Sequence, residues 1–169
     1  EAQCINCHNG PTFTDGTFHN LGLPPRPHTP DGDTGRWRGI ERMRHSDFIA
    51  TGRHSDAPDS ADAKWTRFAR RTDETRGQFK TPTLRNVART PPYMHGPHFD
   101  TLEGVVEFYS RLPGTARVGH REEMLEPLGL SERETRDLVA FLRALSGERP
   151  PAELLEPPES PVPPGSMRD

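Results

Sequence analysis

Cys4-Ile5-Asn6-Cys7-His8 is the most informative segment of the chain, because it has the C-x-x-C-H pattern of a haem c attachment site. Two cysteines three residues apart can reach the two vinyl groups of one haem from a single helical turn. The histidine that follows can then bind the iron as its proximal ligand. The motif therefore predicts one covalently bound haem c, held by Cys4 and Cys7 and ligated by His8.

A C-x-x-C pair also occurs in thiol–disulfide switches and in zinc sites. The chain has only 2 cysteines, so it cannot by itself supply four cysteine ligands to zinc. No strand-rich βαβ pattern surrounds the pair, as a thioredoxin-like fold requires. Haem c is the favoured interpretation, and a thiol switch is the main alternative.

The composition indicates a mainly α domain with long irregular loops around the cofactor. Hydrophobic residues make up only 30% of the 169 residues and 19 residues are proline, which argues against a regular sheet or bundle. The net charge of -3 comes from 22 basic and 25 acidic side chains and argues against a nucleic-acid partner. Since there is no run of about 18 apolar residues, we expect no transmembrane segment.

The expected location is the bacterial periplasm, or the periplasmic face of a membrane complex, because haem c is attached on the outer side of the inner membrane. The chain begins at Glu1, directly before the motif, without a recognisable signal peptide. Export is therefore expected to depend on a removed signal or on a longer precursor.

Two helices are predicted in the second half of the chain. Apolar residues at i, i+3, i+4 and i+7 predict a helix from Thr101 to about Ser110, with Thr101 as its N-cap. The capping box Ser131-Glu132-Arg133-Glu134 predicts a second helix that ends at Gly147.

The rest of the chain has weaker signals. Residues 1–10 are expected to be the end of a helix that carries the motif, and residues 40–50 and 61–71 are short helical candidates. We divide the chain into a cytochrome c-like haem domain, residues 1–149, and an extended proline-rich tail, residues 150–169.

Several separated segments resemble the C-terminal haem domain of the bacterial dihaem cytochrome c peroxidase and MauG family. They agree with that family in order and approximate spacing over residues 4–145. The matching segments are Cys4-Ile5-Asn6-Cys7-His8, Phe18-His19-Asn20-Leu21-Gly22, Asp33-Thr34-Gly35-Arg36, Phe79-Lys80-Thr81-Pro82-Thr83-Leu84-Arg85-Asn86-Val87, Thr90-Pro91-Pro92-Tyr93-Met94-His95-Gly96, Thr101-Leu102-Glu103 and Val106-Glu107-Phe108-Tyr109. The resemblance implies a domain that packs against a second haem domain and holds the six-coordinate, electron-supplying haem.

The resemblance also implies a sixth iron ligand fourteen residues after the histidine of the P-Y-x-H segment. Counted from His95, that position is Tyr109. Peroxidases of the family have methionine there, whereas MauG-like members have tyrosine. A tyrosinate is a hard anionic donor that stabilises the higher oxidation states of iron. From periodicity alone Tyr109 is a core tyrosine of an amphipathic helix, and Met94 is the alternative sixth ligand.

Further site residues follow from the resemblance or from side-chain chemistry. Thr90 and Pro92 match positions whose backbone carbonyls bind Ca2+ between the two haem domains of the family, with another ligand from the other domain. Arg85 and Arg36 are candidate partners of the haem propionates, or else ordinary surface arginines. The other histidines, His19 among them, show no shared metal spacing, and most are expected to be solvated or to cap loops.

The chain has one haem motif, whereas the family has two, and the family's peroxide-binding haem belongs to the other domain. We interpret the chain as an oxidoreductase domain that relays or stores oxidising equivalents for peroxide-dependent chemistry with a partner haem, on a second polypeptide or on a larger redox complex. The alternative is a single-haem electron-transfer subunit of such a complex. Either function requires an electron-donor or electron-acceptor protein. No catalytic residue is assigned, and a six-coordinate iron leaves the isolated chain a poor peroxidase.

Overall fold

The computed structural model describes residues 3–29 and 31–156, and helices provide most of their regular structure. The α-helices are α1 (Arg36–Arg44), α2 (Ala61–Lys64), α3 (Leu102–Arg111) and α4 (Glu132–Ala144). The 3-10 helices are η1 (Gln3–Asn6), η2 (Trp65–Phe68), η3 (Asp73–Thr75), η4 (Val87–Arg89) and η5 (Ala152–Leu154). The two strands, β1 (Phe18–His19) and β2 (Phe79–Lys80), have two residues each. The prediction of a mainly α domain is confirmed.

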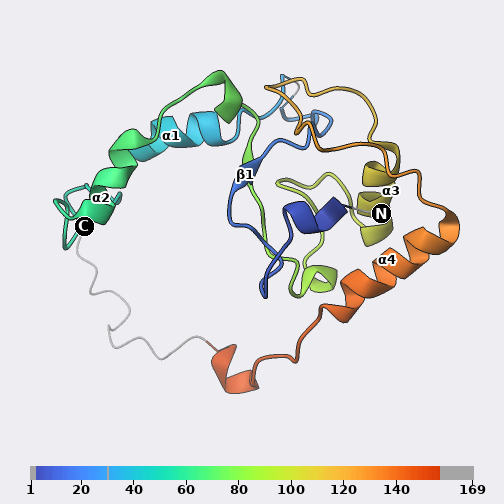
Figure 1. The fold of residues 1–169 in the computed structure, drawn as a ribbon. Coiled ribbons are helices and arrows are strands. Elements are labelled where there is room, and N and C mark those ends of the chain that lie inside the picture. The colour runs from blue at the N-terminus through green and yellow to red at the C-terminus, as the bar shows by residue number, and fades with distance from the viewer. Residues whose placement is uncertain (1–2, 30, 157–169) are drawn as a thin grey trace.

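The apolar core lies where α3 packs against α4 (Figure 1). Both helices begin at the predicted caps. The Thr101 hydroxyl accepts a hydrogen bond from the Gly104 amide at 3.1 Å, and Ser131 forms the capping box with Glu134. Such caps satisfy amides that have no partner inside the helix. The apolar stripes of the two helices meet in a cluster of buried residues: Tyr93, Leu102, Val106, Val139 and Leu142.

The short antiparallel sheet pairs β1, which follows the haem motif, with β2, which precedes Arg85. Phe18 pairs with Lys80 and His19 with Phe79. The pairing extends beyond the sheet, because the Thr81 amide donates to the Thr17 carbonyl at 2.9 Å. Residues 14–19 and 79–83 are thus fixed side by side, beside the turn that carries the two cysteines.

Gly35 explains how the Asp33-Thr34-Gly35-Arg36 segment packs onto this sheet. Its φ is 53°, and a Cβ atom there would lie 2.3 Å from the Gln78 carbonyl oxygen, so only glycine fits. The Asp33 carboxylate accepts a hydrogen bond from the Gly35 amide at 2.9 Å. The Arg36 amide donates to the Gln78 carbonyl at 2.8 Å, which starts α1 directly at the sheet.

Residues 36–76, which we call the arm, differ in detail from the predicted helices. In Figure 1 the sheet separates α1 and α2 from α3 and α4. The candidate helix at residues 40–50 has the wrong bounds, because α1 begins at the Gly35 turn and ends at Arg44, before the turn-favouring Ser46 and Asp47. The candidate at residues 61–71 is α2, which continues as η2.

The predicted tail lies mostly outside the described residues, which end at residue 156. The part that is described, residues 150–156, contains η5, and the division of the chain at residue 149 stays a prediction. In the ranges that the structure describes, no helix combines the length and the apolar character that crossing a membrane requires.

Candidate haem c site

A single turn presents both cysteine sulfurs and His8. The His8 amide donates to the Cys4 carbonyl at 2.8 Å, and the Cys7 amide donates to the same oxygen at 3.3 Å. Both thiols are free; Cys4 is exposed and Cys7 is half-buried. The helix expected at residues 1–10 is, in the described residues, only the short 3-10 helix η1, which ends at Asn6, before Gly10 with its φ of 68°. Two adjacent thiols on one turn match the arrangement that a C-x-x-C-H haem site requires.

The His8 ring has the orientation of a metal-binding imidazole. Its Nδ1 lies 3.0 Å from the Phe13 carbonyl oxygen. Because a carbonyl only accepts hydrogen bonds, Nδ1 carries the proton and Nε2 keeps its lone pair for a metal. Burial lowers the pKa of His8, against the opposing effect of the Phe13 and Pro82 carbonyls. The imidazole is therefore held as a neutral donor, the form that binds iron.

Phe13 owes its position to a strained backbone and two side-chain contacts. Its φ of 52° is in the left-handed region, which is unfavourable for a bulky residue. Its ring meets Phe141 of α4 edge to face, with 6.3 Å between ring centroids. The Arg85 guanidinium lies 5.6 Å from the same ring centroid, and its Nε donates to the Pro11 carbonyl at 2.8 Å. Arg85 and α4 thus hold the loop whose carbonyl orients His8.

Tyr109 comes to the haem motif from α3. Burial raises the pKa of its phenol, and negative charge on Cys4 and Cys7 raises that pKa further. Both thiols are therefore close enough to act on the phenol through space. Phe108 packs edge to face against Tyr109, with 5.3 Å between ring centroids. A buried phenol ionises only beside a positive charge, which a ferric iron provides.

Two of the other predicted site residues, Arg36 and Met94, lie at different places in the fold. The Arg36 guanidinium is at the sheet, 4.4 Å from the Phe18 ring centroid. Met94 has a φ of 77° in the turn that an isolated bridge between Tyr93 and Phe99 closes. Binding of propionates by Arg36 and Arg85, and binding of iron by Met94, stay predictions.

Thr90 and Pro92 form an exposed segment after η4. The Thr90 hydroxyl donates to the Val87 carbonyl at 3.1 Å, and the Pro91–Pro92 peptide bond is cis. The prediction that their carbonyls bind Ca2+ with a ligand from another domain stays untested.

His19 differs from the sequence-based expectation for the remaining histidines. It is not solvated: its side chain is 17% exposed and lies between Asp15 and Glu122. The spacing of Asp15, Thr17 and His19 at i, i+2 and i+4 is a local signal for one face of an extended segment. Glu122 gives no such signal, because it is distant in sequence and reaches the site only through the fold.

The chain matches no family model. It is 40% identical over 154 residues to the cytochrome-c peroxidase IdrP1 of Denitromonas iodatirespirans, and the alignment covers 89% of this chain and 38% of that protein. It is 35% identical over 148 residues to the methylamine utilization protein MauG of Methylorubrum extorquens, covering 88% of this chain and 32% of that protein. The chain thus spans about a third of the length of these relatives.

Two solved structures share the fold at low sequence identity. A MauG-like protein associated with microbial copper homeostasis has a TM-score of 0.55 at 23% identity, covering 87% of this chain and 43% of that chain. The diheme peroxidase BthA of Burkholderia thailandensis has a TM-score of 0.56 at 21% identity, covering 86% of this chain and 39% of that chain. Both similarities extend over most of the chain.

Proposed function

Because the chain is a haem domain of the family of dihaem cytochrome c peroxidases and MauG proteins, we propose that it relays or stores oxidising equivalents for peroxide-dependent chemistry at a second haem. In this proposal Cys4 and Cys7 would hold one haem c covalently, and His8 and Tyr109 would bind its iron. Bound haem supplies one-electron redox chemistry, and the residues of this chain hold it and adjust its potential.

The observation that supports the proposal is that His8, on the turn of the motif, and Tyr109, on α3, both lie near the pair of cysteines. His8 offers Nε2, since its Nδ1–H is bound to the Phe13 carbonyl 3.0 Å away. Tyr109 is half-buried, and burial together with the charges of Cys4 and Cys7 raises the pKa of its phenol. A nitrogen donor and a phenol oxygen near one C-x-x-C turn would together supply the iron of one haem with two protein ligands.

The roles of the chain's own residues follow from this arrangement. The Phe13 carbonyl keeps the proton on Nδ1 of His8, so that Nε2 remains a neutral donor. Because Tyr109 is half-buried, water screens it less than an exposed side chain, which strengthens the attraction between a tyrosinate and a metal cation. A hard anionic ligand favours the more oxidised states of iron, and such a site suits the storage of oxidising equivalents.

The second haem belongs, in this proposal, to the part of the longer protein that this chain does not span, or to a partner polypeptide. Relatives from both the peroxidase and the MauG branch extend well beyond the match, which supports this assignment over a single-haem electron-transfer subunit. The proposal includes a periplasmic location, an electron-donor or electron-acceptor protein, and Ca2+ bound by the Thr90 and Pro92 carbonyls with a ligand from outside this chain.

The proposal is tested by producing the chain in a periplasm that attaches haem c and counting haem by mass after denaturation. We expect one haem per chain, and loss of covalent haem when both Cys4 and Cys7 are replaced by Ala. The purified chain should turn over peroxide only slowly, whereas the longer native protein or complex should carry a second haem and turn it over rapidly. Absence of covalent haem, or rapid turnover by the chain alone, would contradict the proposal.

A further inference from the structure

His19 lies between two carboxylates beside the haem motif. Its Nε2 is 2.7 Å from Asp15 Oδ2, and its Nδ1 is 3.1 Å from Glu122 Oε1. The three side chains are 17%, 16% and 24% exposed, respectively, so water screens their charges only partly. Burial lowers the pKa of His19, but its bonds to the two carboxylates outweigh burial and leave the pKa raised. The hydrogen bond to Asp15 and the negative charge of the nearby Glu122 carboxylate both favour the imidazolium cation.

The backbone and neighbouring side chains hold this cluster in place. The Asp15 amide donates to the Cys7 carbonyl at 2.8 Å, and the Thr17 hydroxyl donates to Asp15 Oδ2 at 2.8 Å. On the other side, the Glu122 amide donates to the Asn20 carbonyl at 2.9 Å. The Asp15 contact is a directed hydrogen bond, whereas the Glu122 contact is an ion pair with poor direction for a hydrogen bond.

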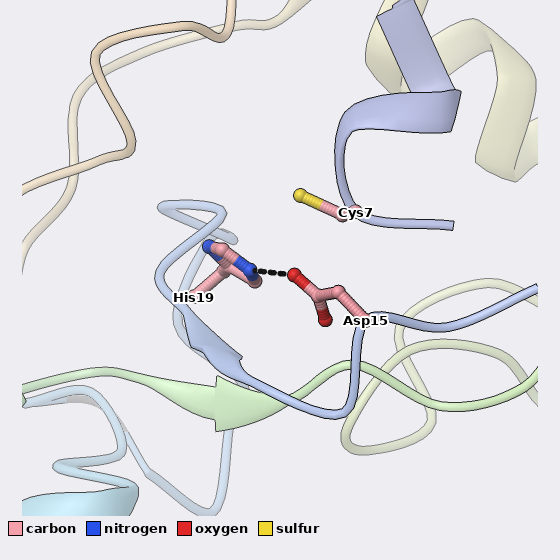
Figure 2. A group of neighbouring side chains, drawn as sticks. All are labelled: Cys7, Asp15 and His19. Atoms are coloured by element: carbon pink, nitrogen blue, oxygen red, sulfur yellow. Dashed lines mark hydrogen bonds and ion pairs between the residues drawn. The ribbon is translucent and has the colours of Figure 1, made fainter. Parts of the chain in front are cut away.

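Figure 2 shows that the sulfur of Cys7 lies near the bonded pair of Asp15 and His19. One ligand atom from each of these three residues lies within 4.8 Å of the others. Burial raises the pKa of the Cys7 thiol, and the charges of Asp15 and Glu122 raise it further. The carboxylates therefore act through space on the very sulfur that joins haem in the proposed function.

Cysteine, aspartate and histidine are also ligands that zinc accepts. In this cluster, however, each ring nitrogen of His19 faces a carboxylate, and a thioether bond to haem would use the Cys7 sulfur. The donors are thus engaged with one another. The arrangement is better suited to placing fixed charges beside the haem edge than to holding a second metal.

We propose, on the basis of the haem c function above, that Asp15, His19 and Glu122 tune the reduction potential of the haem attached to Cys7. The cluster has one cation and two anions, so its net charge is negative. Negative charge near the iron stabilises the ferric over the ferrous state, and the His19 cation limits that effect. His19 acts by placing a positive charge near the haem and does not itself transfer the electron. The electron comes from a one-electron donor protein.

The direction in which the midpoint potential shifts in three variants tests this proposal. His19→Gln removes the cation, makes the cluster more negative and should lower the midpoint potential. Glu122→Gln removes an anion and should raise it. The double variant His19→Gln, Glu122→Gln restores the net charge and should return towards the original potential. A purely structural role for these residues predicts instead that the double variant is shifted furthest.

The measurement is a spectroelectrochemical titration of the haem-loaded chain. Matched controls on exposed surfaces are His45→Gln and Asp137→Asn, which should leave the midpoint potential unchanged, since solvent screens charges there. Asp15→Asn, which should raise the potential, is the substitute if a Glu122 variant does not fold. Equal potentials in all haem-loaded variants, or shifts of one sign only, would overturn the tuning role and leave the haem c function standing. A chain without covalent haem would instead contradict the haem c function.

Discussion

The α3–α4 region and the arm are held together in different ways. Between α3 and α4, apolar side chains such as Val106 and Val139 are each only 2% exposed. In the arm, Trp37 lies under the guanidinium of Arg71, 4.2 Å from the ring centroid, and Arg71 also pairs with Glu41 at 2.6 Å. Burial of apolar area contributes far more stability than such exposed polar contacts. The α3–α4 region, which carries Tyr109, is therefore expected to be the more stable part.

The largest effect is expected from a cavity in the α3–α4 core. Leu102 is 5% exposed, so Leu102→Ala should lower the free energy of unfolding by about 2–5 kcal/mol. Leu154→Ala is the matched control, because Leu154 is 73% exposed, and it should change stability by less than about 0.5 kcal/mol. Denaturant unfolding of both variants gives the comparison. Equal losses would mean that the core does not lie between α3 and α4.

A smaller effect is expected at the start of α4. Ser131 accepts a hydrogen bond from the Glu134 amide at 3.3 Å, and Glu134 bonds back to the Ser131 amide at 2.9 Å. Ser131→Ala breaks this capping box and should cost about 1 kcal/mol of stability. Ser55→Ala, in the arm, is the control in the same unfolding assay. A loss as large for the control would argue against a special role for the cap.

A substitution in the arm should change the stability of the arm alone. Arg71→Gln removes both the stacking on Trp37 and the ion pair with Glu41, a change of at most about 1 kcal/mol. Amide hydrogen exchange should become faster in residues 36–76 and remain unchanged in α3 and α4. Arg133→Gln is the control, because the Arg133 side chain lies on the exposed face of α4. Faster exchange throughout the chain after Arg71→Gln would show that the two regions open together.

The pH dependence of stability gives the smallest predicted effect. Hydrogen bonds from His19 and Thr17 outweigh burial and hold the pKa of Asp15 below its ordinary range. The ionised Asp15 therefore stabilises the fold above about pH 4, and this stabilisation is lost as pH falls. The raised pKa of His19 contributes stability below about pH 6.5, which is lost as pH rises through the folded-state value. The His19→Gln variant should lack the decline at high pH. If the pH dependence of the free energy of unfolding, measured with denaturant, were unchanged in His19→Gln, a charged pair of His19 and Asp15 would be contradicted.

The parts of the fold that local patterns specify could be predicted from the sequence. The capping box of Ser131 and the stripe that begins after Thr101 predict α4 and α3 within a few residues, because caps and periodicity are local properties. The C-x-x-C-H turn is likewise a contiguous signal. For Tyr109, periodicity alone indicates only a core position, and the resemblance supplies the expectation that it lies near the motif.

Other features could not be predicted, because they depend on contacts between distant segments. The start of α1 depends on Gly35 meeting the Gln78 carbonyl. The Phe13 carbonyl reaches His8 only because of a left-handed backbone that Arg85 and α4 support. Glu122 joins His19 from the loop after α3, and neither residue type indicates the other in sequence.

The ferric spin state of Tyr109→Phe, with haem attached, is the decisive measurement for binding of the iron by Tyr109. Loss of the phenol oxygen should convert a low-spin, six-coordinate iron to a high-spin form, visible by absorption and electron paramagnetic resonance. Tyr93→Phe is the matched control, since Tyr93 is the other tyrosine and belongs to the core cluster, and it should leave the low-spin signal in place. An unchanged low-spin spectrum in Tyr109→Phe would contradict ligation by Tyr109 and favour Met94.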